Sequence, residues 1–227
     1  HPPDRCAHIW SQESGKAISS VILKENAPPV KAIFVVHSPI RDIEMFRAFA
    51  EQIARLKPFS RIDMNINFTA EKADFEMPEG GSPWHEYAAY DRSLSKFFPD
   101  EKIAPFIPEE LVKKNRQLLL SKVIIIRDLG LDAGYRSNEP HFLPEAFFES
   151  YPHLRGPRVD HPRRSLQKEF APCFHQKETE EMYQNMANTL FEIIPEVHTV
   201  YFSMNDAGSG FCWADWLYSG PNGPAEC

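Results

Sequence analysis

Asn205 and Asp206 are the residues whose types and position point most directly to chemistry. They follow the stretch 199–204 (TVYFSM), which is typical of a strand, and precede Gly208 and Gly210, which let a ligand approach the backbone closely. A carboxylate placed there would serve as the general acid that protonates the leaving oxygen in glycoside cleavage. Asn205 would orient the sugar or polarise an N-acetyl group. The alternative is an Asx-turn that caps the strand.

Polar residues also follow the expected third strand, residues 131–135. Glu139 would supply a second carboxylate, and the Arg136 guanidinium would bind a substrate carboxylate through two hydrogen bonds. Asn138, which lies between them, is a further candidate for substrate binding. A salt bridge within the loop would account for Arg136 and Glu139 without a ligand.

His37, Asp160 and His161 are candidates from other parts of the chain. His37 ends the expected strand 32–36, where its ring would bind a sugar hydroxyl, unless the imidazole is buried for structural reasons. Asp160 and His161 lie in the arginine-rich stretch 158–164, which would bind an acidic sugar such as a uronate. In the alternative interpretation Asp160 only neutralises the neighbouring arginines.

Trp213 and Trp216 come soon after Asp206. Aromatic rings of this kind stack on the apolar face of a pyranose, so both are assigned to substrate binding. Packing within the loop is the other explanation.

The sequence predicts neither a metal site nor another cofactor. Residues that could bind a metal lack the spacing of H-x-H or H-E-x-x-H motifs: His37, His85, Asp160, His161 and Asp206. The four cysteines form no C-x-x-C pair, and their spacing does not establish any disulfide: Cys6, Cys173, Cys212 and Cys227.

The elements that must position these residues alternate between strand and helix. The expected strands are residues 32–36, 61–68, 131–135 and 199–204. The expected helices are residues 41–56, 108–129, 144–150 and 178–194. Such alternation predicts parallel strands joined by right-handed crossovers.

Long connections at about residues 69–107 and 137–176 follow the second and third strands, whereas the connections after the helices are short. This asymmetry is typical of a (β/α)₈ barrel of the TIM type, in which the carboxyl ends of the strands form the site. A full barrel has eight units in about 250 residues. We therefore predict a single α/β domain over residues 1–227, the N-terminal half of a barrel with about four β-α units. A doubly wound sheet is the alternative, although no glycine-rich phosphate motif follows the first strand.

The composition of the chain argues against some classes of binding partner. The 227 residues carry a net charge of −7 and no basic stripe, which argues against nucleic acid and anionic membranes as ligands. No apolar run reaches the roughly 20 residues of a membrane-spanning helix. The chain begins at His1 without a signal-peptide pattern, so we expect either a removed leader or an excised fragment. A removed leader would imply a secreted or periplasmic protein, and otherwise a cytoplasmic one. The oligomeric state is left open.

Two stretches resemble known barrel proteins. FSMNDAGSGFCWADW (202–216) is similar to the fourth-strand motif of uncharacterised barrel proteins related to α-glucuronidases and β-N-acetylhexosaminidases, and GYRSNEPHFLPEAFFESYPHLRGPRVDHPRRS (134–165) resembles their third-strand loop. The resemblance extends from about residue 33 to the C-terminus. It implies that Asp206, the second residue of the polar pair, is the acid/base. The hexosaminidase pattern has Asp-Glu where Asn205–Asp206 stands here.

These observations predict a carbohydrate-active hydrolase of the glycoside hydrolase class, with an oligosaccharide or polysaccharide as its substrate. Two alternatives remain open. One is a non-catalytic glycan-binding barrel domain, and the other is a metal-dependent hydrolase on the same scaffold.

Overall fold

The computed structural model describes residues 33–37, 40, 42–59, 63–67, 93–159, 168–203 and 210–212. Every described residue belongs to the part of the chain from residue 33 to residue 227. No helix among the described residues is long and apolar enough to cross a membrane.

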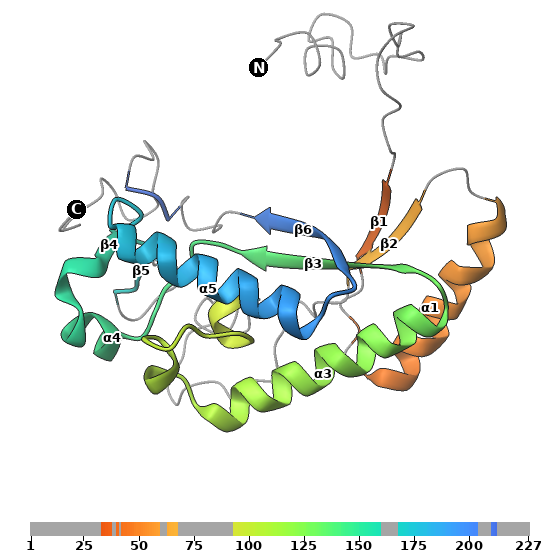
Figure 1. Ribbon diagram of the computed structural model, residues 1–227, viewed down its shortest axis with the longest axis horizontal. Coiled ribbons are helices and arrows are strands. Elements are labelled where there is room, and N and C mark those ends of the chain that lie inside the picture. The colour runs from red at the N-terminus through yellow and green to blue at the C-terminus, as the bar shows by residue number, and fades with distance from the viewer. Residues whose placement is uncertain are drawn as a thin grey trace, which may run out of the picture. The chain divides into compact units, whose positions relative to one another are not determined.

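Four parallel strands form the main sheet (Figure 1). They are β1 (Ile33–His37), β2 (Asp63–Asn67), β3 (Asp132–Asn138) and β6 (Val197–Ser203). Their order in the sheet, β1-β2-β3-β6, follows their order along the chain. The predicted mixed α/β arrangement with a parallel sheet is therefore confirmed. The described strands form an open sheet, and no closed barrel is seen among them.

Three long helices connect these strands and lie on the same side of the sheet (Figure 1). They are α1 (Ile43–Leu56), α3 (Glu109–Asp128) and α5 (Lys177–Ile193). The Asp42 carboxylate caps α1 by accepting a hydrogen bond from the Met45 N–H at 2.8 Å. One apolar stripe of each helix is buried in a common core, because residues three or four apart share a helix face.

The side chains of β3 alternate between the two faces of the sheet. Ala133 and Tyr135 point into the helix-covered core, where both are almost fully buried. Arg136 and Asn138 lie on the opposite face because side chains alternate along a strand. The predicted strand 131–135 is three residues too short, since backbone pairing with β6 continues to Asn138 opposite Ser203.

A second, two-stranded antiparallel sheet follows β3 and was not predicted. The helix α4 (Glu145–Ser150) leads to β4 (Arg155–Arg158), which pairs with β5 (Phe170–Pro172). The sequences RGPR and FAP contain proline and no apolar alternation, so they lack the usual signs of a strand. The structure thus contains a small sheet within the predicted loop 137–176.

The described end of the other long connection, residues 93–107, belongs to the core. Leu94, Phe97, Phe98 and Ile103 are at most 1% exposed. Four short 3₁₀ helices occur in the described chain, two of them in this stretch: η1 (Lys57–Phe59), η2 (Leu94–Lys96), η3 (Ala104–Phe106) and η4 (Pro152–Leu154). This part of the predicted loop is therefore a packed element.

Candidate functional site

The carboxyl ends of the four parallel strands meet at one edge of the sheet. His37 at the end of β1 is in register with Asn67 at the end of β2. Asn67 pairs in turn with Gly134, and β3 continues beyond it to Asn138, which is opposite Ser203. In sheets of this kind, ligands bind at the carboxyl ends of the strands. This edge is the candidate site.

Arg136, Asn138 and Tyr201 lie on the sheet face opposite the three long helices. Arg136 is half-buried and in register with Tyr201, and Asn138 is only 7% exposed. Burial raises the pKa of the Tyr201 phenol, so its hydroxyl is neutral at physiological pH. Guanidinium, amide and phenol groups together offer hydrogen bonds to hydroxyl or carboxylate groups of a ligand. Alternation along β6 puts Tyr201 on this face, but the sequence analysis did not select it.

Glu139 points to the other side of the sheet. Its Oε1 accepts hydrogen bonds from the Leu94 N–H and the Ser137 hydroxyl, both at 2.6 Å, and its Oε2 accepts one from the Tyr183 hydroxyl at 3.1 Å. These donors come from η2, β3 and α5. The carboxylate of Glu139 therefore joins three elements beneath the candidate edge.

The environment of Glu139 also changes the pKa of Tyr183. Burial, followed by the charge of Glu139 and the hydrogen bond to it, raises the pKa of the Tyr183 phenol well above its ordinary value of 10.0. The phenol remains a hydrogen-bond donor to Glu139 across the neutral pH range.

His141 and Lys96 are buried near the end of β3 and were not selected from the sequence. His141 is 2% exposed, and its ring lies 4.4 Å from the ring of Phe142 between centroids. The Lys96 ammonium lies 5.8 Å from the centroid of the same Phe142 ring, within the range of cation–π attraction. Lys96 could not be found from the sequence, because its stretch was interpreted as a loop. His141 comes two residues after Glu139, which was the available sign.

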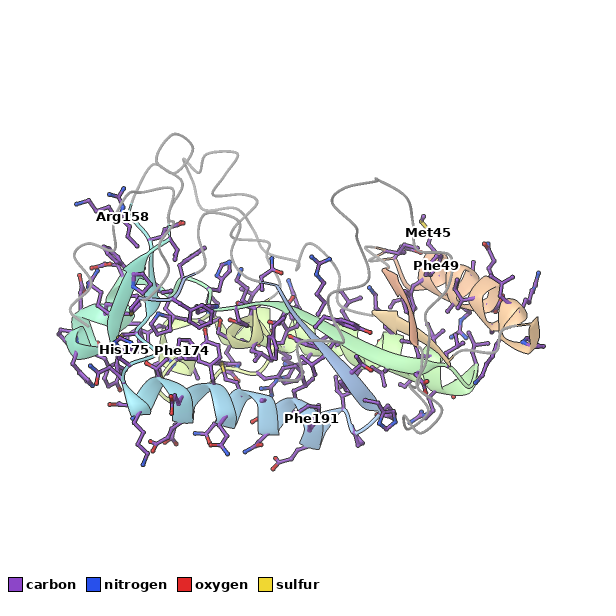
Figure 2. The ribbon with its side chains drawn as sticks, turned by 90° about the horizontal axis from the view of Figure 1, so that it is seen from above. Met45, Phe49, Arg158, Phe174, His175 and Phe191 are labelled. Carbon is purple, nitrogen blue, oxygen red and sulfur yellow. The ribbon has the colours of Figure 1, made fainter. Side chains whose placement is uncertain are left out.

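The segment that follows β6 returns to the end of β3. Gly210 has φ +72°, and a Cβ at this position would lie 2.7 Å from Pro140 Cγ and 2.9 Å from the Pro140 carbonyl oxygen. The Phe211 ring packs edge-on against Phe174 at 5.3 Å between centroids. Figure 2 shows Phe174 and His175 beside the N-terminal end of α5. The stretch 204–209 is thus flanked on both sides by residues that contact the carboxyl end of β3 or the elements next to it.

The predicted site residues fall into four groups. Arg136 and Asn138 lie together on the sheet face opposite the helices, and Glu139 is held on the helix-covered side. Asn205, Asp206, Asp160, His161, Trp213 and Trp216 lie outside the described residues. For His37 the structure describes the backbone of β1 alone.

Arg158 is the last residue of β4 and the described residue nearest in sequence to the pair Asp160–His161, apart from Val159. It is half-buried, and in Figure 2 its side chain lies on the side of the small sheet away from α5. Its neighbour Arg155 pairs with the Glu145 carboxylate and lies over the Phe148 and Phe170 rings at 5.1 and 4.7 Å. Arg155 therefore stabilises the small sheet.

Within the described ranges, no three His, Cys, Asp or Glu side chains are grouped so that they could hold a metal ion. Among the described residues at this edge, Arg136, Asn138 and Tyr201 carry groups that are capable of hydrogen bonding.

Fold and site define the chain as an α/β protein whose sequentially ordered parallel sheet presents polar groups at its carboxyl edge. Comparison with protein-family models, curated proteins and solved structures finds no match.

Proposed function

We propose that this chain folds as β-α units of a (β/α)₈-type carbohydrate-active hydrolase, which binds a glycan at the carboxyl edge of its sheet and uses Asp206 as the proton donor. The observation on which this proposal mainly depends is the position of β6. Its last residue, Ser203, is in register with Asn138, and the chain is next described at Gly210, against Pro140. Asn205 and Asp206 fall between these two points in the sequence.

The strand order supports the barrel part of the proposal. Among the described strands of the main sheet, those that follow one another in the chain are neighbours, and their order does not reverse. A doubly wound sheet has a point at which the order reverses and places helices on both faces. Consecutive strands with all their long helices on one side are the arrangement found in a barrel wall.

The side chains on the sheet face opposite the helices support a hydroxylated or acidic ligand. In a barrel this face lines the interior, and here it presents Arg136, Asn138 and Tyr201 near the carboxyl edge. A guanidinium next to neutral hydrogen-bonding groups suits a sugar that carries a carboxylate, such as a uronic acid.

Glu139 does not serve as the second carboxylate in this proposal. Its oxygens already accept three hydrogen bonds from the protein, and it lies on the helix-covered side. We assign it a structural role, in which it fixes the end of β3 from which Arg136 and Asn138 project.

The test compares Asp206→Asn with the wild-type chain on a panel of aryl glycosides and aryl glucuronides. Loss of a general acid lowers the rate by about 10²- to 10⁴-fold. Asp132→Asn is the matched control, because Asp132 begins β3 at the opposite edge of the sheet. We expect Asp132→Asn to retain wild-type activity and both variants to bind glycans on an array.

The other outcomes separate the alternatives. Glycan binding without hydrolysis by the wild type would favour a non-catalytic glycan-binding domain. Activity that disappears with a chelator would favour a metal-dependent hydrolase. A folded wild-type chain that neither binds nor cleaves any glycan overturns the proposal.

A further inference from the structure

We propose that Cys173 and Cys212 form a reversible disulfide, which fastens the segment after β6 to the scaffold. Their sulfur atoms are 3.5 Å apart although 39 positions separate them in the chain, and no disulfide links them in the structure. A disulfide has an S–S distance of about 2.05 Å, so the bond requires the sulfur atoms to approach by about 1.5 Å.

Cys173 is the fixed member of the pair. It is fully buried between β5 and α5, and its N–H donates to the Leu154 carbonyl at 2.8 Å. Its own carbonyl accepts a hydrogen bond from the Gln176 N–H at 3.1 Å, immediately before α5. The backbone on both sides of the buried thiol is therefore held by hydrogen bonds.

Cys212 is the accessible member. It is half-buried and stands two residues after Gly210. The contacts of Gly210 with Pro140 and of Phe211 with Phe174 bring its segment to Cys173. The segment 210–212 is thus placed by two contacts that do not depend on the thiols, and these contacts bring the two sulfur atoms together.

The chemistry needs an oxidant, and a low-molecular-weight disulfide of the glutathione type suffices. The Cys212 thiolate attacks one sulfur of that disulfide, forming a mixed disulfide and releasing one thiolate. The Cys173 thiolate then attacks Sγ of Cys212 and releases the second thiolate. The two protein thiols lose two electrons and two protons in total, and the small disulfide is reduced to two thiols.

The bond would close a loop that contains α5, β6 and the stretch 204–209. If the proposed function is right, oxidation would restrain the loop that contains Asn205 and Asp206. This consequence depends on the proposed function, whereas formation of the disulfide does not.

The test uses the full chain with Cys6→Ser and Cys227→Ser, so that Cys173 and Cys212 are the only thiols. The protein is treated with oxidised glutathione or with dithiothreitol, denatured, alkylated and mapped by mass spectrometry. We expect one linked peptide pair containing both residues, and a Tm of the oxidised form higher by roughly 5–15 °C. Adding Cys212→Ser removes the linked pair and the difference in Tm.

A second variant tests the geometry. Gly210→Ala places a Cβ against Pro140 at a positive φ, so it should displace Cys212 and slow cross-linking several-fold. Gly130→Ala also replaces a positive-φ glycine, but far along the chain from the thiols, and should leave the rate of cross-linking unchanged.

Complete alkylation of both thiols after oxidation would overturn the proposal. Cross-linking at the same rate in native and urea-unfolded protein would overturn it too, because the folded chain would then contribute nothing. Mapping requires no sugar, so a linked pair in a protein without glycan activity refutes the proposed function alone, and an active protein without the link refutes this inference alone.

Discussion

The Glu139 carboxylate shows how the surroundings of one residue determine its role. From the sequence it follows a strand and resembles a second catalytic carboxylate. In the structure it is 7% exposed and accepts hydrogen bonds from residues on three elements. Hydrogen bonds to a buried charged group are stronger than those between neutral groups. Glu139 therefore stabilises the fold at the candidate edge.

Replacing Glu139 with Gln should lower the free energy of unfolding by about 1.5–3 kcal/mol, because the charged acceptor of three donors is lost. The same change should bring the pKa of Tyr183 closer to 10.0, since the Glu139 charge and hydrogen bond raise it. Urea unfolding and alkaline titration of tyrosine absorbance measure the two effects. Glu149→Gln, at an exposed position on α4, is the control and should change neither.

Because the pKa of Tyr183 is raised, the contribution of this residue to the stability of the fold decreases at alkaline pH. The folded protein holds this proton more tightly than the unfolded chain, whose phenol has a pKa near 10. The contribution of Tyr183 is therefore fully present below pH about 10 and is lost as the pH rises through the higher folded value. In the Tyr183→Phe variant, the free energy of unfolding should therefore fall less steeply as the pH rises above about 10. An unchanged alkaline profile in that variant would contradict the assignment.

At the scale of elements, the β4–β5 pair depends on close backbone approach. A Cβ on Gly156 would lie 2.7 Å from the Ala171 carbonyl oxygen, the Pro172 carbonyl carbon and the Cys173 nitrogen. All three are backbone atoms, which cannot rotate away as a flexible side chain can. Glycine at this position is what allows the two strands to pair.

Gly156→Ala should therefore destabilise the protein by about 3 kcal/mol or more, at the upper end of the cost of overpacking. Native-state hydrogen exchange should also become faster at the Val159 and Cys173 amides, which bond Glu169 and Leu154 across the small sheet. Gly130→Ala is the comparison. Its Cβ would make an ordinary van der Waals contact with the Lys57 Nζ, at 3.9 Å, so the positive φ of +63° is what opposes the substitution, at a cost of about 1–2 kcal/mol. Exchange at Val159 as slow as in the wild type would show that the strands tolerate the added methyl group.

At the scale of the whole molecule, one hydrophobic core contains side chains from segments that lie far apart in the chain. Phe97 and Phe98 pack against Tyr135 of β3, with ring centroids 6.3 and 6.1 Å apart. The Arg116 guanidinium of α3 lies 5.4 Å from the centroid of the Phe98 ring. The stretch 93–107 thus fills the space between the sheet and α3.

Phe98→Ala should lower the free energy of unfolding by about 3–5 kcal/mol, the usual cost of removing a buried aromatic ring. Phe191→Ala on the outer side of α5, where the ring is 44% exposed and is labelled in Figure 2, should cost about 1 kcal/mol or less. Chemical denaturation of both variants measures the difference. Similar losses would mean that residues 93–107 contribute little to the core.

Much of the architecture was predictable because its causes are local. The helix over residues 41–56 was expected from apolar spacing, and α1 occupies Ile43–Leu56. The strand expected at 199–204 corresponds to β6 at Val197–Ser203. The end of β3 was missed, because Arg136 and Asn138 are polar and pairing with β6 alone extends the strand to them. The β4–β5 pair was missed because its short sequences contain proline and no apolar alternation.

The sequence by itself determined the alternation of strands and helices, and hence the parallel sheet, because apolar periodicity, capping and proline positions act within a few residues along the chain. Only the tertiary structure decided which polar groups share a face, which carboxylate accepts hydrogen bonds from the protein itself, and which thiols are neighbours. Arg136 and Tyr201 lie 65 positions apart in the chain and are in register. Glu139 accepts hydrogen bonds from residues on η2 and α5. The sulfur atoms of Cys173 and Cys212 are neighbours. Such proximities arise from packing between distant segments, and no local pattern encodes them.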